Sequence, residues 1–316
     1  MNTKKILLVI SICFLLFSAC QKEQKYPQPI STFDSTQSVQ DSLAKQINSL
    51  PLIREIKYSF YKPARGNVYK ELLEKFDTAG VEIILALNRV DRNTIRKLDS
   101  LVIPDTILIN INYYSPFPQH VDLLEKVSKM LIISQKQQAF AAYEYGSLIK
   151  WGPSSTGKRS TPTPNGLFHT NWKSKKTIST INEEWILKWY FNLDNFDGIS
   201  IHEYELPGYP ASHSCARLLA EDARWIYYWA EQWVLTSDGE NIIVFGTPTI
   251  IYDKYDFKGV KPWKLLPTEP DSAKISKEVL APVLQEHIFT ILKRQEEREK
   301  ILNEREQNLA STKNNF

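Results

Sequence analysis

Residues 200–233 read SIHEYELPGYPASHSCARLLAEDARWIYYWAEQW and include Cys215, the only cysteine after position 20. Two of the five histidines, His202 and His213, lie within thirteen residues of it. A cysteine thiol is only slightly ionised at neutral pH, and it becomes a strong nucleophile when a neighbouring base removes its proton. The turn-rich residues 206–210 between the histidines can fold one of them back onto the thiol. The pattern therefore favours a cysteine nucleophile with a histidine base.

The composition of the whole chain excludes several other kinds of protein. The 316 residues are 24% charged and 42% hydrophobic, with a net charge of +3. This length is enough for roughly two domains with a sizeable core. The charge is too small to indicate nucleic-acid binding, and no basic stripe interleaved with aromatic residues is present. Because the other two cysteines fall within the first twenty residues, Cys215 has no partner later in the chain for a disulfide or a Cys-rich zinc site.

Several short motifs around Cys215 carry a family resemblance. Residues 212–218, SHSCARL, resemble the Ser-His-Gly-Cys-x-Arg-Leu signature of the L,D-transpeptidase catalytic domain, the YkuD-like family with its ErfK and YbiS relatives. Further motifs agree in order, namely Ser-Thr-Gly-Lys at 155–158, Thr-Pro-Asn-Gly-Leu-Phe at 163–168, Ile-His at 201–202, Ala-Glu-Asp-Ala at 220–223 and Phe-Gly-Thr-Pro at 245–248. The resemblance covers about residues 128–253.

This resemblance implies a mainly β fold, with an L,D-transpeptidase-like β-sandwich catalytic domain at 126–253 and one helix after the cysteine. A small α/β N-terminal region and a helical C-terminal tail complete the predicted fold. The implied reaction is acyl transfer on peptidoglycan stem peptides. The thiolate attacks a tetrapeptide donor, D-alanine leaves, and a diaminopimelate amine of a second stem resolves the thioester into a 3→3 crosslink. Neither a metal nor an organic cofactor is implied.

The same resemblance implies roles for the residues nearest the thiol. Cys215 corresponds to the nucleophile, and His202 corresponds to the general base that deprotonates it and then protonates the leaving amine. His213 and Ser212 correspond to signature residues that position this pair. These four residues and Ser214 form the predicted catalytic group.

Three further residues belong to the predicted site. Arg217 and Tyr209 are the predicted substrate-binding residues, and an arginine just after the cysteine suits a substrate carboxylate. Ser214 stands where the family usually has glycine. Its backbone N–H is the predicted oxyanion donor. A serine there costs strain if the position requires a positive φ.

The N-terminus has the pattern of a bacterial export signal. A basic start precedes the apolar run ILLVISICFLLF at 6–17, which is too short for a spanning helix of about 20 residues. Phe-Ser-Ala-Cys at 17–20 resembles the lipobox of lipoproteins, although phenylalanine replaces the usual leucine. We therefore expect a lipoprotein signal peptide at 1–19 and lipid attachment at Cys20. The mature protein would then be lipid-anchored in the cell envelope and face the periplasm.

Three predicted segments flank the catalytic domain. Residues 20–50 are a polar tether, rich in Gln, Ser and Lys. Residues 51–125 form an accessory region that is weakly similar to a LysM glycan-binding module at 84–105, and we favour a packing subdomain there. Residues 254–316 form a C-terminal extension with a charged helix, which we expect to be solvated or loosely packed.

Residue periodicity predicts the main elements. Alternation predicts a strand pair at 129–134 and 138–145, and later strands near 199–202, 242–245 and 249–252. A helix is predicted at 221–233, with its tryptophans every four residues on a face that packs into the core. Residues 69–76 are predicted to be helical, whereas 81–87 suit either a strand or a buried helix.

Two alternatives to transpeptidation stay open from the sequence. Water as the acceptor would make the protein an L,D-carboxypeptidase. A decayed site, marked by Ser214, would leave a catalytically inactive cell-wall-binding lipoprotein. A live thiol should be acylated by a carbapenem, whereas a decayed site should give no adduct.

Overall fold

A computed structural model describes residues 56–64, 66–179 and 182–313. Residues 56–316 form one compact unit of the two into which the chain divides. The predicted signal peptide, the lipid attachment at Cys20 and the tether lie outside the described residues. Among the helices of the described part, none is long and apolar enough to cross a membrane.

Residues 56–104, called the N-terminal module below, form two short strands with two helices between them. Strands β1 (Tyr58–Tyr61) and β2 (Leu101–Pro104) pair antiparallel. Helices α2 (Val68–Lys75) and α3 (Thr78–Asn88) lie between them in the chain. Asp77 caps α3 by accepting a hydrogen bond from the Gly80 N–H at 2.7 Å. Nearly every residue of α3 after its first turn is buried, so residues 81–87 form a buried helix and not a strand.

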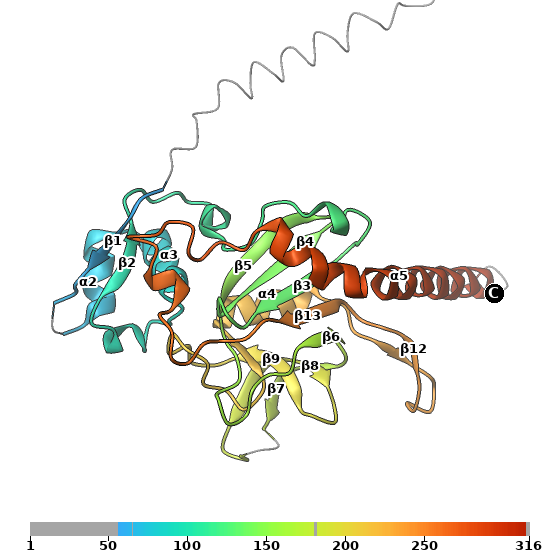
Figure 1. The fold of residues 1–316 in the computed structure, drawn as a ribbon. Coiled ribbons are helices and arrows are strands. Elements are labelled where there is room, and N and C mark those ends of the chain that lie inside the picture. The colour runs from blue at the N-terminus through green and yellow to red at the C-terminus, as the bar shows by residue number, and fades with distance from the viewer. Residues whose placement is uncertain (1–55, 65, 180–181, 314–316) are drawn as a thin grey trace, which may run out of the picture. The chain divides into compact units, whose positions relative to one another are not determined.

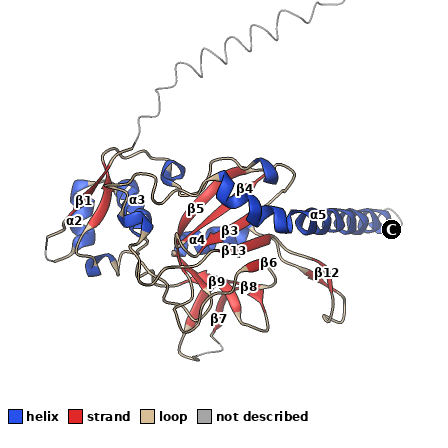
Figure 2. Cartoon of the chain, in the orientation of Figure 1, coloured by secondary structure: helices blue, strands red, loops and turns tan. Residues whose placement is uncertain are grey.

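The strands of residues 130–252 include a single nine-stranded sheet (Figure 2). Its spatial order is β6-β13-β3-β4-β5-β10-β9-β8-β7, mainly antiparallel, with parallel pairs β13·β3 and β10·β9. The mainly β fold is confirmed. The strands are β3 (Met130–Ser134), β4 (Ala139–Glu144), β5 (Ser147–Ser155), β6 (Gly166–His169), β7 (Lys173–Ile178), β8 (Ile186–Asp194), β9 (Ile199–Glu203), β10 (Ala216–Leu218) and β13 (Pro248–Tyr252).

Both faces of the sheet are covered by apolar cores. On β3, Met130 and Ile132 belong to the core shared with α3, whereas Leu131 and Ile133 belong to the core under α4. This alternation is the period of two expected of a strand, and all four side chains are buried because both faces are covered. The predicted strand pair at 129–134 and 138–145 is therefore present as β3 and β4.

Helix α4 (Ala220–Trp229) follows β10 and ends earlier than predicted. Ala230 turns to an extended conformation, and the N–H of Trp233 donates to the carbonyl of Asn171 at 3.1 Å. This bond to a distant loop takes the place of a further helical turn. Trp225 and Trp229 stack on each other with centroids 5.0 Å apart and pack against the core. Beyond α4 lies a small hairpin, β11 (Val234–Leu235) and β12 (Ile242–Val244).

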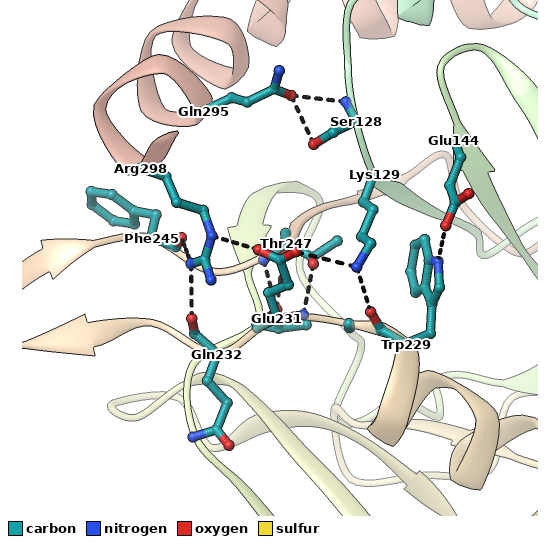
Figure 3. A network of polar contacts seen from close by, with 12 residues as sticks. Ser128, Lys129, Glu144, Trp229, Glu231, Gln232, Phe245, Thr247, Gln295 and Arg298 are labelled. Carbon is teal, nitrogen blue, oxygen red and sulfur yellow. Dashed lines mark hydrogen bonds and ion pairs between the residues drawn. The ribbon is translucent and has the colours of Figure 1, made fainter. Parts of the chain in front are cut away.

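The C-terminal helix α5 (Lys277–Lys313) is packed in its first half, in contrast to the loosely held helix expected. Leu280, Leu284 and Ile291 are buried in the core shared with α3. Figure 3 shows two hydrogen bonds from the next turns to residues that adjoin the strands. The Gln295 side chain accepts from the Ser128 N–H at 2.8 Å, and Arg298 donates to the Phe245 carbonyl at 2.8 Å. In Figure 1 the remaining turns extend away from the sheet.

Short 3₁₀ turns complete the described part, at Ile95–Lys97, Ile111–Tyr114, Asp122–Leu124 and Pro262–Lys264. The N-terminal module meets the sheet around Arg89, which is almost fully buried. Its guanidinium donates to the Gln137 carbonyl at 2.8 Å and lies 5.3 Å from the ring centroids of both Trp151 and Trp263. Part of the contact between the module and the rest of the fold is therefore a cation–π arrangement of one arginine with two tryptophans.

Candidate active site

The parallel pairing of β9 with β10 brings the predicted nucleophile and base together. His202 on β9 is opposite Arg217 on β10, and Cys215 immediately precedes β10. The thiol lies beside the start of β9, where the Ser200 hydroxyl donates to its sulfur at 3.1 Å. Cys215 Sγ is also 3.4 Å from the Gly198 carbonyl oxygen. His202 and Cys215, thirteen positions apart in the chain, thus line the same cavity.

His202 is held in one tautomer by the backbone. Its Nδ1 lies 2.9 Å from the carbonyl oxygen of Glu203. A carbonyl can only accept, so Nδ1 carries the proton and the neutral ring keeps its lone pair on Nε2. Burial, assisted by the positive charge of Arg217, lowers the pKa of His202 to about 4. The imidazole is therefore neutral at neutral pH and available as a base.

The thiol also rests in its neutral form. Burial raises the pKa of Cys215, while the hydrogen bonds from Ser200 and the charge of Arg217 lower it in part. Burial thus favours the neutral thiol over the thiolate. The arrangement suits proton transfer from sulfur to Nε2 when a substrate carbonyl arrives.

Two cavities meet at Cys215. The first, called the His202 pocket, has a volume of about 30 Å³ and is lined by Cys215 together with Trp185, His202, Tyr204, His213 and Arg217. The second, called the Ser200 pocket, has a volume of about 160 Å³ and is lined by Cys215 together with Tyr190, Asn192, Gly198 and Ser200. A substrate whose carbonyl group lies at the sulfur can thus extend into both cavities, and only the His202 pocket contains the base.

Ser212 fixes the loop that carries the thiol. It is buried, and its hydroxyl donates to the Cys215 carbonyl in a short hydrogen bond. Its own N–H donates to the Thr156 carbonyl at 3.0 Å, and its carbonyl accepts from the Lys158 N–H at 3.0 Å. The role of Ser212 is therefore to hold the loop shape.

Ser214 has φ = 78°, in the left-handed region that favours glycine. This is the backbone conformation at which the replacement of glycine by serine costs strain. The Ser214 hydroxyl is 3.5 Å from the Thr161 carbonyl oxygen, at the limit of a hydrogen bond. That contact offers little compensation for the strain.

His213 is tied to a lysine and not to the thiol. Its Nε2 lies 2.7 Å from Lys158 Nζ. An ammonium group can only donate, so Nε2 accepts and the proton of the neutral ring is on Nδ1. Burial lowers the pKa of His213, and the charges of Lys158 and Arg217 lower it further. With Nε2 occupied, His213 shapes the wall of the His202 pocket and leaves the role of base to His202.

The two predicted substrate-binding residues are placed differently. Arg217 lines the His202 pocket, with its guanidinium 4.4 Å from the ring centroid of Tyr204. Tyr209 is about half exposed and lies near Lys261, whose Nζ is 5.4 Å from the ring centroid. Tyr209 is not among the described residues that line either pocket. The structure therefore brings Arg217 to the thiol but not Tyr209.

Sequence reasoning missed two residues that contact this site, Ser200 and Lys158. Ser200 is two residues before His202, so the period of a strand places both on one side of β9, and this signal was available. Lys158 was visible only as part of a motif. Its contact with His213 depends on the bridge between Gly157 and Ser212, which no local pattern predicts.

A possible cation site lies away from these pockets. Among the described residues, His120, Asp122 and Glu125 are the group whose ligand atoms all lie within 4.8 Å of one another. They are on the surface, and Lys277 Nζ is 3.1 Å from Asp122 Oδ1. The ammonium already occupies the place where a cation would be attracted, so we assign no metal there.

The site thus combines a cysteine just before β10 with a histidine on the parallel strand β9, within a mainly β fold. Residues 128–251 match the family model of the YkuD L,D-transpeptidase catalytic domain, which confirms the family resemblance for this part of the chain. Residues 128–251 are therefore similar to this catalytic domain.

Solved structures of several L,D-transpeptidases are similar to part of the chain. The enzyme from Mycobacterium smegmatis is 19% identical, with a TM-score of 0.31, over 40% of this chain and 59% of that one. The Stackebrandtia nassauensis enzyme is 18% identical, with a TM-score of 0.32, over 40% and 57%. L,D-transpeptidase 3 of Mycobacterium tuberculosis is 18% identical, with a TM-score of 0.32, over 40% and 61%. The chain thus spans about three fifths of the length of these relatives. No curated protein matches its sequence.

Proposed function

We propose that the protein is a peptidoglycan L,D-transpeptidase that forms 3→3 crosslinks between stem peptides through a thioester at Cys215. The observation that carries the proposal is the tautomer of His202. Its Nδ1 is bound to the Glu203 carbonyl, which leaves Nε2 as a base in the pocket that Cys215 also lines. This is the geometry that a thiol needs for activation.

The first half-reaction makes the thioester. As the thiol proton passes to His202 Nε2, Sγ attacks the carbonyl between the L-centre and the D-alanine of a tetrapeptide donor. The C–N bond then breaks, and His202 returns the proton to the leaving amine. The backbone N–H groups of 213–215 are proposed to stabilise the oxyanion, and among the described residues no backbone acceptor is bound to them.

The second half-reaction transfers the acyl group. The acceptor amine of a second stem, diaminopimelate in this proposal, attacks the thioester while His202 takes its proton. The C–S bond breaks and His202 returns that proton to the sulfur. Arg217 supplies a positive charge in the His202 pocket that suits a substrate carboxylate.

The anchoring of the protein is part of the same proposal. The lipobox-like Cys20 would attach lipid chains, and the catalytic domain would face the periplasm, where stem peptides are accessible. The support for this step is the sequence pattern of residues 1–20.

The test replaces the nucleophile. Cys215→Ala should abolish dimer formation from tetrapeptide muropeptides, which mass spectrometry measures, while circular dichroism shows an intact fold. Tripeptide without dimer from the unaltered protein would instead favour the carboxypeptidase. A carbapenem should add to the unaltered protein and not to the variant. No adduct and no product from the unaltered protein would favour the inactive wall-binding alternative.

A further inference from the structure

The Ser200 pocket contains a row of polar side chains that leads to the sulfur of Cys215. Ser200, Tyr190 and Asn192 all line this pocket together with the thiol. Ser200 is completely buried, and Tyr190 and Asn192 are almost fully buried. Buried polar groups are normally hydrogen-bonded, and each group has a fixed number of protons to donate. The direction of every hydrogen bond in the row therefore follows from the groups at its start.

The row starts at the Asn192 amide, whose orientation is fixed by its partners. Its Nδ2 lies 3.1 Å from the Asp194 carbonyl oxygen, which can only accept, so this atom is the donor nitrogen. Its Oδ1 accepts from Asn171 Nδ2 at 2.9 Å. The same Nδ2 of Asn192 lies 3.3 Å from the Tyr190 hydroxyl oxygen. The Tyr190 oxygen therefore accepts from Asn192, and its own proton is free to be donated elsewhere.

The Tyr190 proton is donated to Ser200. Burial raises the pKa of Tyr190, while its hydrogen bonds with Asn192 and Ser200 lower it in part. Because the Tyr190 oxygen already accepts from Asn192, its proton is directed to the Ser200 oxygen. The Ser200 hydroxyl has one proton of its own, and the atom that remains to accept it is the sulfur, 3.1 Å away.

The proton of the thiol itself points elsewhere. Cys215 Sγ lies 3.4 Å from the Gly198 carbonyl oxygen, which can only accept. The thiol proton is thus engaged by Gly198, so the proton between Sγ and the Ser200 oxygen belongs to Ser200. All the hydrogen bonds of the row therefore point toward the sulfur.

A hydrogen bond of this direction favours negative charge on the sulfur. A hydrogen bond to an ionised acceptor is roughly twice as strong as one to a neutral acceptor. In the proposed reaction the sulfur gains negative charge twice, as its proton passes to His202 and as the C–S bond of the thioester breaks. Ser200 keeps its own proton in both steps, so the row stabilises charge without consuming or releasing an atom.

We propose that Ser200 is a further catalytic residue, which stabilises the anionic sulfur of Cys215, and that Tyr190 and Asn192 are positioning residues, which direct the Ser200 proton to that sulfur. This inference rests on the proposed function for the two steps that it assists. The hydrogen bonds themselves belong to the resting protein and can be tested without a substrate.

The test measures how readily Cys215 ionises. Purified protein reacts with iodoacetamide at neutral pH, and mass spectrometry of the peptide that contains Cys215 gives the rate at this residue alone. This rate is proportional to the thiolate fraction, because the thiolate is the reactive form. Circular dichroism checks that each variant keeps its fold.

Four variants separate the row from the rest of the pocket. Ser200→Ala removes the donor to the sulfur, whereas Ser200→Thr keeps a hydroxyl, and its added methyl group faces a cavity of about 160 Å³. Tyr190→Phe removes only the hydroxyl and keeps the ring, which stacks on His202 with centroids 6.4 Å apart. Thr177→Val is the matched control, because it removes a hydroxyl from the same pocket. Among the described residues, the hydrogen bonds of the sulfur are with Ser200 and Gly198.

We expect alkylation of Cys215 to be about tenfold slower in Ser200→Ala, because a hydrogen bond to a charged group shifts a pKa by about one unit. Tyr190→Phe should be about threefold slower, since the Ser200 proton then loses its fixed direction. Ser200→Thr and Thr177→Val should stay within about twofold of the unaltered protein.

An unchanged rate in Ser200→Ala would overturn the inference, and an unchanged rate in Tyr190→Phe would do so even if Ser200→Ala failed to fold. An equal loss in Thr177→Val would overturn it too, because the cause would then be the general polarity of the pocket. If the unaltered protein released no D-alanine from a tetrapeptide, the proposed function would fail, whereas the alkylation rates would still decide whether the row stabilises the thiolate.

Discussion

Cys215 and His202 are both neutral at rest, and this follows from their burial. Burial disfavours the thiolate and the imidazolium alike, and Arg217 opposes the imidazolium further. In the proposed mechanism the proton would therefore move as the carbonyl carbon accepts the sulfur. The pH dependence of the reaction should therefore show that His202 acts from its neutral form.

We predict that kcat/KM for D-alanine release falls on acidification only near pH 4. His202 acts as a base in its neutral form, and its pKa is lowered to about 4, so activity is present above this value and is lost as pH falls through it. A pH–rate profile measures the midpoint. An acid limb near 6.5 would contradict the assignment of a buried base.

Arg217→Gln provides the control for that profile. Without the positive charge the acid midpoint should rise, yet stay below 6.5, because burial is the larger cause of the lowered pKa. Arg217→Lys keeps the charge and should keep the midpoint. The overall rate falls in both variants, so the position of the midpoint is the informative quantity.

Ser214→Gly should stabilise the protein. Relief of the left-handed conformation at φ = 78° is worth about 1–2 kcal/mol. The greater freedom of glycine in the unfolded chain offsets about 0.5–1 kcal/mol of this. We expect a net rise of about 0.5–1 kcal/mol in the free energy of unfolding, measured by urea denaturation. Ser214→Ala keeps the strain and should show no gain, and an equal gain in both variants would refute this explanation.

Among the elements, the loop between β9 and the signature is held by the N-terminal module. The Asp91 carboxylate accepts from the Leu206 N–H at 2.7 Å, and the Thr94 hydroxyl donates to the Leu206 carbonyl. The same carboxylate also accepts from the N–H groups of Asn93 and Thr94 at 2.7 and 2.9 Å. One side chain thus orders two loops, one of which joins His202 to Ser212.

Asp91→Ala should lower the free energy of unfolding by about 1.5–3 kcal/mol, the usual range for hydrogen bonds to a charged group. Urea denaturation measures the change. Asp99→Ala, at an exposed position in the same loop, is the matched control and should change stability by less than about 0.5 kcal/mol. Equal stability of the two variants would show that Asp91 does not hold the loop.

Elements were predictable where their evidence is local. The alternation at 129–145 identified β3 and β4. Residues 81–87 were predicted to be either a strand or a buried helix, and they form a buried helix. The end of α4 and the packing of α5 were not predicted. Both depend on contacts with distant residues, such as Trp233 with Asn171 and Gln295 with Ser128.

Across the whole molecule, the module and the sheet share one core. Ile83 and Leu87 of α3 pack in the same cluster as Trp151 of β5 and Leu284 of α5. Tyr114 and Phe117, from a stretch rich in aromatics and prolines, are buried in it as well. A linker-like composition of prolines and aromatics can therefore conceal core residues, because burial depends on what packs against them.

The order of amino acids is sufficient to predict the mainly β class, the resemblance to the YkuD L,D-transpeptidase catalytic domain, and Cys215 and His202 as the candidate nucleophile and base, because short motifs and strand periodicity carry that information. The side chains that contact the candidate site residues could not be predicted in this way. Ser200 reaches the thiol because β9 pairs with β10, and Lys158 reaches His213 because Gly157 and Ser212 form a bridge. Such contacts join residues far apart in the chain, and their geometry depends on packing that no local pattern records.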